Sequence, residues 1–381
     1  MANSLNIVPA VPTARSPRGI VLLGDPNQPG TRVPWVDWEV DQNVWHSAST
    51  FRMRLPISAL SDPINLNYIL GTNPIQAQIY AGFPANPDQY GTSDLQQLIT
   101  GNVDSIQFDP ARRTVELAGR DYTSLLIDAK TYDRWANQTA SQIATTLAKR
   151  HGMTPLVTAT TGLVGKIYEI DKIHDRHGST EWELLTWLAG IYDYVVYVQG
   201  MTLRFGPKPD PKSATPYLIQ WQNPDQNTPF FQANALDLSF SRTLTVGKGV
   251  IVQVHSWNHK QKAGFSVTYP QGKAKGIVPG TAKAPAQVYS YVIANLSQQD
   301  AQQRAAKIYN DIIRHELKMN ADLPGDNILV PNVMVQVSGT QTPFDSLYYV
   351  ESVSRRMSFD GGYRMAVRGK NHSLDTSVIP S

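Results

Sequence analysis

Few residues of this chain have types and spacings that could perform chemistry. The cluster most like a metal site is an HDRH run that contains His174 and His177. It lies just before an expected helix start, and two histidines are fewer ligands than a stable zinc site uses, so a solvated loop is the simpler interpretation. His255 and His259 are spaced i, i+4, but they fall where an expected strand ends. We therefore predict no metal site.

Paired carboxylates could serve a glycosidase, which needs two of them on either side of the scissile bond. Glu181 and Glu183 form one such pair, and Asp94 and Asp104 form another. Acids at a helix start are equally explained by capping and by the helix dipole. The sequence has no nucleophile elbow, phosphate loop, H-E-x-x-H pair or dinucleotide fingerprint, and no cysteine. We predict no catalytic residue and no cofactor.

The strongest charge feature is a segment without acids. No aspartate or glutamate occurs between Asp237 and Asp300, whereas seven lysines and arginines do. The lysines of this segment could meet an acidic protein surface or passing DNA, and a solvated loop is the plainer interpretation. Aromatic residues are not interleaved at regular spacing, so specific reading of nucleic acid is not expected. The candidate basic residues are Lys260, Lys262, Lys273, Lys275 and Lys283.

Two tryptophans are further interface candidates. Trp38 has the inward phase of an expected alternating strand, which leaves Trp35 and Trp45 without an obvious place in its core. Such residues can anchor a protein–protein interface. Ordinary packing explains them as well, so both interpretations stay open.

The composition suits a protein with large permanent contacts. Charged residues make up 17% of the 381 residues, against a typical ~25%, although an ordinary globular protein remains an alternative. The net charge of +3 is too small to indicate nucleic-acid binding by itself. We find neither the pattern of an export signal nor an apolar stretch near the ~18 residues of a membrane span. We expect no membrane anchor.

The elements that would position these residues come from a duplication. VDSI leads to FD and then to VELAGRD, which ends at Asp121; later, VESV leads to FD and then to MAVRGKN, which ends at Asn371. Counted back from these ends, Gly119 pairs with Gly369. Each copy predicts a strand, a turn and an alternating strand.

Weaker matches lie upstream in the same order. PIQAQIYAG resembles NVMVQVSG, and VDWEVDQNV from Val36 resembles LDLSFSRTL from Leu236. Beyond this point the copies slip by one residue, so that the strand at 51–55 matches 250–254, with a bulge or a changed turn between. Three matches in one order indicate a true duplication.

We therefore predict an α+β fold, mainly β, with two duplicated antiparallel β-barrel modules and two α/β insert domains. Helix signals mark the inserts: Thr139 and Gln142 form a capping box before a helix that ends at Arg150, and the longest helix runs from Ser297 to about Glu316. The predicted ranges are a flexible arm at 1–18, a first barrel at 19–121, an α/β insert at 122–212, a second barrel at 213–257 and 327–374, a helix-containing insert at 258–326, and a tail at 375–381.

The duplication has a consequence for symmetry. Closed rings are the usual form of homo-oligomers. Three copies of a chain with two similar modules would present six similar modules. Such a trimer could meet a sixfold partner on one face and a threefold partner on the other.

The chain also resembles a known family. TVELAGRDYTSLLIDAK, WANQTASQIATTLAKRHG and TEWELLTWLAGIYDYVVYVQGMTLRF resemble the late control protein D group, the baseplate hub proteins of contractile phage tails, and so do HELKMNADLPGDNILVPNVMVQVSG and YYVESVSRR. The patterns AGRD-x-T-x-x-LID and N-x-T-x-x-QIA are the most specific. The resemblance covers about Arg18 to Leu374, and the length is similar to that of hubs of Mu-like phages.

This resemblance implies tail-tube-like barrels in a homotrimeric ring of pseudo-sixfold symmetry with a central channel. The ring would join the hexameric tail tube to a trimeric spike protein. Tail tube, spike and baseplate wedge proteins would be its partners, and tape-measure protein and transiting DNA are further candidates. The location would be the tail baseplate of a virion, after assembly in the host cytoplasm; tailocins and type VI secretion spikes share the module.

Two other classes of function stay open. A tail-associated cell-wall hydrolase would need a carboxylate cluster with shifted pKa values in a concave pocket. A carbohydrate-binding tail protein would show exposed aromatic platforms.

Overall fold

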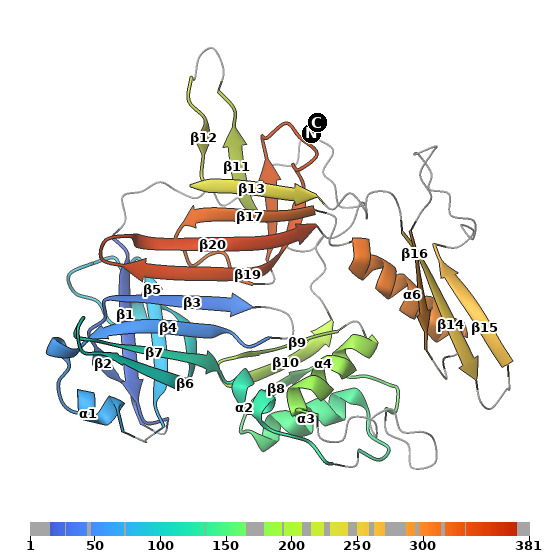
Figure 1. The fold of residues 1–381 in the computed structure, drawn as a ribbon, viewed down its shortest axis with the longest axis horizontal. Coiled ribbons are helices and arrows are strands. Elements are labelled where there is room, and N and C mark those ends of the chain that lie inside the picture. Colours follow the sequence, from blue (N-terminus) through green and yellow to red (C-terminus); the bar gives the residue numbers. More distant parts are fainter. Residues whose placement is uncertain are drawn as a thin grey trace.

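The computed structural model is mainly β, as predicted, and consists of two β modules and two α/β parts (Figure 1). The predicted tail and nearly all of the predicted arm lie outside the described residues. The structure describes residues 16–371 except 27, 44–46, 72–73, 134, 165–178, 193, 208–214, 225–228, 243–249, 259–262, 271–286, 294–295, 297, 314–316 and 332.

The first module is an antiparallel sheet whose strands pair in the order β3-β4-β7-β6-β5-β1-β2. Side chains alternate between a buried and an open face, because successive residues of a strand point to opposite sides. Figure 1 shows β1 and β5 crossing the direction of β3, β4 and β7, and side chains of all these strands share one core. The elements are β1 (Arg18–Gly24), β2 (Thr31–Val33), β3 (Asp37–Asn43), β4 (Thr50–Pro56), the short helices η1 (Ile57–Ala59) and α1 (Leu66–Ile69), β5 (Gln76–Gly82), η2 (Thr92–Asp94), β6 (Gln96–Asp109) and β7 (Thr114–Asp121).

The second module repeats this order as β13-β17-β20-β19-β18-β11-β12 around a core of its own. One pairing departs from the antiparallel barrel that we predicted: β11 runs parallel to β18, whereas β1 runs antiparallel to β5. The strands are β11 (Tyr217–Gln222), β12 (Gln232–Ala233), β13 (Asp237–Arg242), β17 (Leu317–Pro324), β18 (Met334–Ser338), β19 (Leu347–Ser358) and β20 (Gly362–Asn371).

The duplication extends to an irregularity in the sheet. Opposite Gly119 and Gly369, β6 and β19 each carry a one-residue bulge, at Asp104 and Glu351 respectively. Each bulge residue forms an ion pair with the basic residue that follows the glycine. Arg120 lies 2.7 Å from the Asp104 carboxylate, and Lys370 lies 2.5 Å from that of Glu351.

A capping contact is also shared by the two copies. The Asp121 carboxylate accepts a hydrogen bond from the backbone N–H of Ser49 at 2.9 Å, and the Asn371 amide oxygen accepts one from Leu317 at 3.1 Å. Ser49 immediately precedes β4, and Leu317 is the first residue of the equivalent strand β17. The two modules therefore match in strand order, bulge, ion pair and side-chain hydrogen bond.

Two details of the predicted duplication are wrong. The counterpart of β4 is β17, because both pair with the glycine-containing strands β7 and β20, so the predicted match of 51–55 to 250–254 fails. The phenylalanines of the two FD pairs, Phe108 and Phe359, are not equivalent either. Phe108 aligns with Arg355, and Phe359 lies in the turn that follows β19. Both errors arose because alternating apolar residues mark a strand without marking its partner.

The boundaries of the second module change accordingly. β14 (Val250–Asn258), which we placed in the second barrel, pairs with β15 (Ala263–Tyr269) and β16 (Gln287–Val292) in a separate sheet. β17, which we placed in the insert, belongs to the module. Helix α6 (Gln298–Ile313) packs on one face of the separate sheet through Ala301 and Ala305. We call this sheet and helix the small domain.

The first insert holds helices on a three-stranded sheet in the order β8-β10-β9, in which β8 is parallel to β10. The predicted capping box is present: Thr139 N–H donates to the Gln142 side chain at 2.8 Å, and Gln142 N–H donates to the Thr139 hydroxyl at 3.3 Å. The elements are α2 (Thr123–Asp128), α3 (Ala140–Arg150), β8 (Thr154–Val157), α4 (Glu181–Tyr192), β9 (Tyr194–Gln199) and β10 (Thr202–Pro207).

Candidate assembly interface

Most of the predicted interface residues cannot be placed. Trp45 and all five candidate lysines lie outside the described residues, as do the HDRH run and His259. Trp35 is half-buried, donates its indole N–H to the Gly19 carbonyl at 3.3 Å, and stacks on Phe359 with ring centroids 5.0 Å apart. Phe359 belongs to the β19–β20 turn, so Trp35 contacts the second module of its own chain.

The two modules are joined by strand pairing. The second half of β19, Ser352–Ser358, runs antiparallel to β3 from Asn43 back to Asp37. The pairing makes one continuous ladder in the order β13-β17-β20-β19-β3-β4-β7-β6, visible as the stack of crosswise strands in Figure 1. Met357 and Tyr363 of the second module thereby enter the core of the first.

A buried arginine holds this junction. Arg355 is 1% exposed and donates to the carbonyls of Asp326 and Leu329, the former at 2.9 Å. It also donates to the Gln42 side chain of β3 at 2.6 Å. Burial lowers the pKa of the Arg355 guanidinium. The hydrogen bonds offset this desolvation, which would otherwise be costly.

The loop that accepts from Arg355 contacts the first module as well. Asn327 donates to the Ala81 carbonyl of β5 at 2.7 Å and accepts from the Tyr363 hydroxyl at 2.8 Å. Tyr217 donates to the Asp326 carboxylate at 2.8 Å. The pKa of Tyr217 is raised well above its usual range. The main cause is desolvation, and the negative charge of Asp326 is the second. The loop is therefore fixed from both modules.

The two ends of the ladder are equivalent to the edges that meet at the junction between the modules, and in the described part of the chain neither end has a further strand partner. The second half of β6, equivalent to the joining half of β19, pairs only with β7 among the described residues, and β13, equivalent to β3, pairs only with β17. Ile106 and Phe108 of β6 are 37% and 43% exposed, whereas their counterparts Val353 and Arg355 are buried. An exposed apolar strand edge is a site for pairing with another chain.

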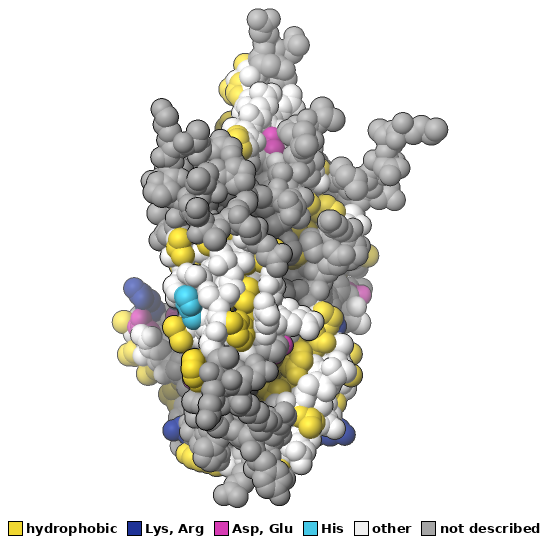
Figure 2. All heavy atoms as spheres, turned by 90° about the vertical axis from the view of Figure 1, so that its right-hand side faces the viewer, with side chains coloured by type: hydrophobic (Ala, Val, Ile, Leu, Met, Phe, Trp, Pro, Cys, Tyr) yellow, Lys and Arg dark blue, Asp and Glu magenta, His cyan; other side chains and the backbone are white. Residues whose placement is uncertain are grey.

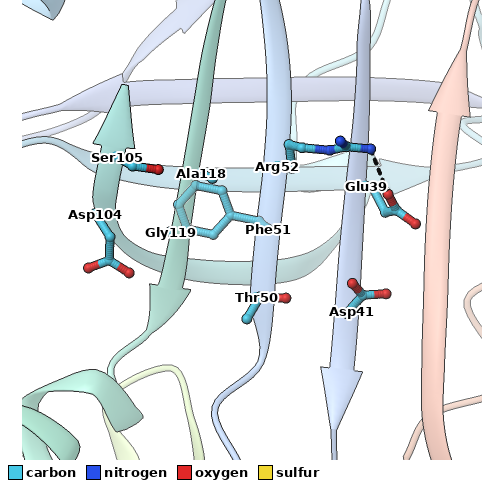
Figure 3. Close-up of a pocket in the computed structure, with 9 residues that line it drawn as sticks. All are labelled: Glu39, Asp41, Thr50, Phe51, Arg52, Asp104, Ser105, Ala118 and Gly119. Carbon is cyan, nitrogen blue, oxygen red and sulfur yellow. Dashed lines mark hydrogen bonds and ion pairs between the residues drawn. The ribbon is translucent and has the colours of Figure 1, made fainter. Parts of the chain in front are cut away.

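The open face of the ladder contains a shallow hollow of about 410 Å³. Figure 3 shows Arg52 of β4 reaching to Glu39 of β3, at 3.2 Å, with Asp104 on the other side of the hollow. Glu39 also accepts from the Ser354 hydroxyl at 3.2 Å, and Asp104 accepts two hydrogen bonds from Arg120. The pKa of Arg120 is raised, most strongly by its hydrogen bonds to Asp104 and less strongly by those to Asp128. These carboxylates thus have structural partners.

The carboxylates singled out from the sequence have structural partners too. Glu181 is buried and pairs with Arg150 at 2.5 Å and His151 at 2.6 Å. Glu183 caps α4 by accepting from Thr180 N–H at 3.0 Å, and Asp94 accepts from Gly91 N–H at 2.9 Å. Within the described part of the chain, no cluster of three or more His, Asp or Glu residues could hold a metal ion. No described helix is long and apolar enough to span a membrane.

Comparison with known proteins places this geometry in a class. No family model matches the chain, and no curated protein matches it in sequence. Solved structures do match: the tail protein from Neisseria meningitidis MC58 has a TM-score of 0.66 at 17% identity, over 93% of this chain and 96% of that one. The chain therefore has the fold of a phage tail protein.

Two further structures support this assignment of the fold. The 43 kDa tail protein of prophage MuSo2 from Shewanella oneidensis has a TM-score of 0.60 at 15% identity, over 92% of this chain and 98% of that one. The E. coli c3393 protein is a type VI secretion component with structural similarity to T4 bacteriophage tail proteins. It has a TM-score of 0.53 at 10% identity, over 94% of this chain and 79% of that one. The resemblance to tail proteins seen in the sequence is confirmed at the level of the fold.

Proposed function

We propose that this protein is a structural baseplate hub of a contractile phage tail. In this proposal three copies form a pseudo-sixfold ring around a central channel, which adapts the hexameric tail tube to the trimeric central spike. The protein has no catalytic role. Its place is the tail of the virion, after assembly in the host cytoplasm.

The observation that carries the proposal is a repeated junction. Within each chain, β19 of the second module pairs with β3 of the first, and the equivalent strands β6 and β13 lie at the two ends of the ladder without such a partner among the described residues. The β19–β3 pairing shows how one module meets the next. The open edges of β6 and β13 are the equivalent surfaces at the opposite ends of the same ladder. Such head-to-tail contacts produce a ring when the rotation between copies closes.

The internal junction supplies the register for the contact between copies. Arg355 lies opposite Val40 in that junction. In the other module, Phe108 of β6 is the counterpart of Arg355. Phe240 of β13 is the counterpart of Val40 of β3. In the proposed ring Phe108 of one copy therefore lies opposite Phe240 of the next. Phe240 is already stacked on Phe344, with centroids 5.0 Å apart, so the contact would bury a third aromatic ring, worth roughly 1.5–3 kcal/mol.

Cysteine cross-linking tests this register directly, because the chain has no cysteine of its own. The double variant with Phe108→Cys and Phe240→Cys should form disulfides between copies on mild oxidation. A closed ring should run as a covalent trimer on a non-reducing gel. Strand partners directly opposite each other bring Cβ atoms to about 4.5–5.5 Å, close to disulfide distance.

Matched controls separate the ring from random contact. Each single cysteine variant should stay below the trimer, and so should Tyr132→Cys paired with Phe240→Cys, because Tyr132 is an exposed aromatic residue in the first insert. A double variant that forms only dimers or an unlimited ladder of products would contradict a closed trimer.

The proposed partners are the tail tube, the trimeric spike and baseplate wedge proteins, with tape-measure protein and DNA passing through the channel. The similarity of this fold to prophage tail and type VI secretion proteins supports them. Co-purification with candidate tube and spike proteins from the same source tests them. A trimer that binds neither protein would contradict the adaptor role.

Carbohydrate binding is the second candidate function, because one aromatic group is exposed. Trp221 stacks on Phe231 with centroids 4.9 Å apart, and Phe230 is exposed beside it on the hairpin that projects beyond the ladder in Figure 1. Glycan-array binding that disappears in Trp221→Ala would favour this function. Absence of glycan binding together with tube or spike binding would favour the hub.

A further inference from the structure

The junction between the two modules of one chain includes an aromatic contact beside the paired strands. Trp35 precedes β3 and stacks on Phe359 of the β19–β20 turn. The Trp35 ring packs against Gly19 of β1, where an added Cβ would lie 3.2 Å from the ring and 3.1 Å from the Met357 sulfur of the second module. The position of Gly19 therefore faces the neighbouring module, and the absence of a side chain there leaves room for the Trp35 ring.

The second module has no tryptophan before its equivalent strand. Val36 donates its backbone N–H to β4 at 2.8 Å, and Leu236 donates the equivalent hydrogen bond to β17 at 2.7 Å. The residue before each of them is therefore equivalent, and Ala235 stands where the first module has Trp35. A buried alanine replaces the ring that contacts the neighbouring module.

The second module has a tryptophan on the neighbouring strand instead. Val21 of β1 and Ile219 of β11 lie opposite equivalent residues of β5 and β18. Because β11 runs in the opposite direction to β1, two residues further toward the same end of the module are Gly19 and Trp221. Paired residues of neighbouring strands point to the same face of a sheet. The place that faces a neighbouring module is thus occupied by Trp221.

The aromatic group around Trp221 is exposed. Its ring stacks on Phe231 with an interplanar angle of 4°, and Phe231 and Phe230 are 57% and 78% exposed. In Figure 1 the β11–β12 hairpin carries this group past β13, the last strand of the ladder. Figure 2 keeps the same vertical direction and shows hydrophobic side chains on this uppermost part of the molecule. The group lies at the end of the ladder where another module would continue it.

The first module of another copy offers a matching surface. Pro110 begins the β6–β7 turn and is the counterpart of Met357, which the position of Gly19 faces in the internal junction. The same turn holds Arg112, whose side chain is 79% exposed and lies 3.6 Å from Asp109. An exposed ion pair of this kind contributes little, so the guanidinium can lie over an aromatic ring instead.

We propose that the aromatic group of Trp221, Phe230 and Phe231 docks on the β6–β7 turn of the next copy of this chain. The Trp221 ring packs against Pro110, and the Arg112 guanidinium lies over the exposed rings. This contact rests on the ring of the proposed function, and it is the counterpart of the aromatic contact within the chain. Protein rather than glycan is the favoured occupant, because protein fills the equivalent place in the first module.

Cross-linking separates this contact from the ring itself. Gln222 and Ala111 are exposed and follow Trp221 and Pro110 directly, so cysteines there leave the contact residues in place. The double variant Gln222→Cys and Ala111→Cys should give a covalent trimer with a short bis-maleimide. No trimer from this pair, when the cysteine pair across β6 and β13 does give one, overturns the docking proposal and leaves the hub intact. No trimer from either pair overturns both.

A double-mutant cycle measures the contact. Trp221→Ala should raise the concentration at which the trimer is half dissociated by at least ~10-fold. Arg112→Ala should raise it about 2–5-fold, as expected for a cation–π contact near the surface. Because the two residues act on one another, the double variant should be affected by less than the product of the two single effects. Single effects that simply multiply would contradict a contact between these residues.

Controls keep the result interpretable. Tyr132→Ala removes an exposed aromatic residue of the first insert and should assemble as the wild type does. Melting temperatures should show that each variant is folded. Glycan binding that disappears in Trp221→Ala, in a variant whose trimer dissociates at the wild-type concentration, would overturn the docking proposal and assign the aromatic group to carbohydrate.

Discussion

At the residue scale, equivalent positions in the two modules have different side chains where their neighbours differ. Arg355 is covered by the loop at 325–330 and by Gln42, whereas its counterpart Phe108 is exposed. We expect Arg355→Ala to lower the free energy of unfolding by about 3–5 kcal/mol, because it leaves buried acceptors without a donor. Arg356 is the exposed neighbour of Arg355, and Arg356→Ala should change the free energy of unfolding by less than ~0.5 kcal/mol. Chemical denaturation of both variants measures the contrast, and equal effects would refute a special role for Arg355.

Asp121 and Asn371 are equivalent, but only Asp121 titrates. Burial raises the pKa of Asp121, and hydrogen bonds from Ser49 and Thr123 offset part of this effect. A raised pKa in the folded state means that Asp121 favours folding when protonated, and that this contribution is lost as pH rises above 3.8 through the folded pKa. We expect the stability of the wild type relative to Asp121→Asn to fall as pH increases in that interval. A difference that is constant with pH would contradict the expectation.

At the scale of elements, the glycines of β7 and β20 have unequal amounts of space. A Cβ at Gly119 would overlap the Asn102 carbonyl oxygen and come within 2.5 Å of the Phe51 ring, whereas at Gly369 its nearest neighbours are 3.1 Å away. We therefore expect Gly119→Ala to cost more than ~3 kcal/mol, and Gly369→Ala about 1–2 kcal/mol. Thermal unfolding of the two variants should rank them in this order; the reverse order would contradict the packing described.

At the scale of the whole molecule, the open edge of β6 should determine assembly. We expect Phe108→Asp to abolish the oligomer, because it would place a carboxylate against the apolar side of β13, and to leave the monomer folded, because Phe108 is already exposed. Light scattering gives the mass, and circular dichroism reports the fold. Tyr132→Asp is the matched control and should assemble normally. A trimer that survives Phe108→Asp would move the interface elsewhere.

Much of the local structure could be predicted from the sequence. The capping box at Thr139, the alternation of β7 and the equivalence of Gly119 with Gly369 all depend on neighbours within a few residues. Of the predicted interface residues, Trp35 alone can be assessed, and it packs inside the chain. Arg355 was missed because nothing in its local sequence shows that a strand from the other module covers it.

The sequence by itself determined that this protein has two related β modules with helical inserts, since strand alternation and helix caps are encoded in adjacent residues. Only the tertiary structure decided that β17 rather than β14 completes the second module, and that β19 joins β3. Both β14 and β17 alternate in the same way, and alternation specifies which face of a strand is buried without specifying which strand lies beside it. Strand partners are chosen by contacts between residues far apart in the chain, and in the part of the chain that the structure describes those contacts leave β6 and β13 with one neighbouring strand each along these edges.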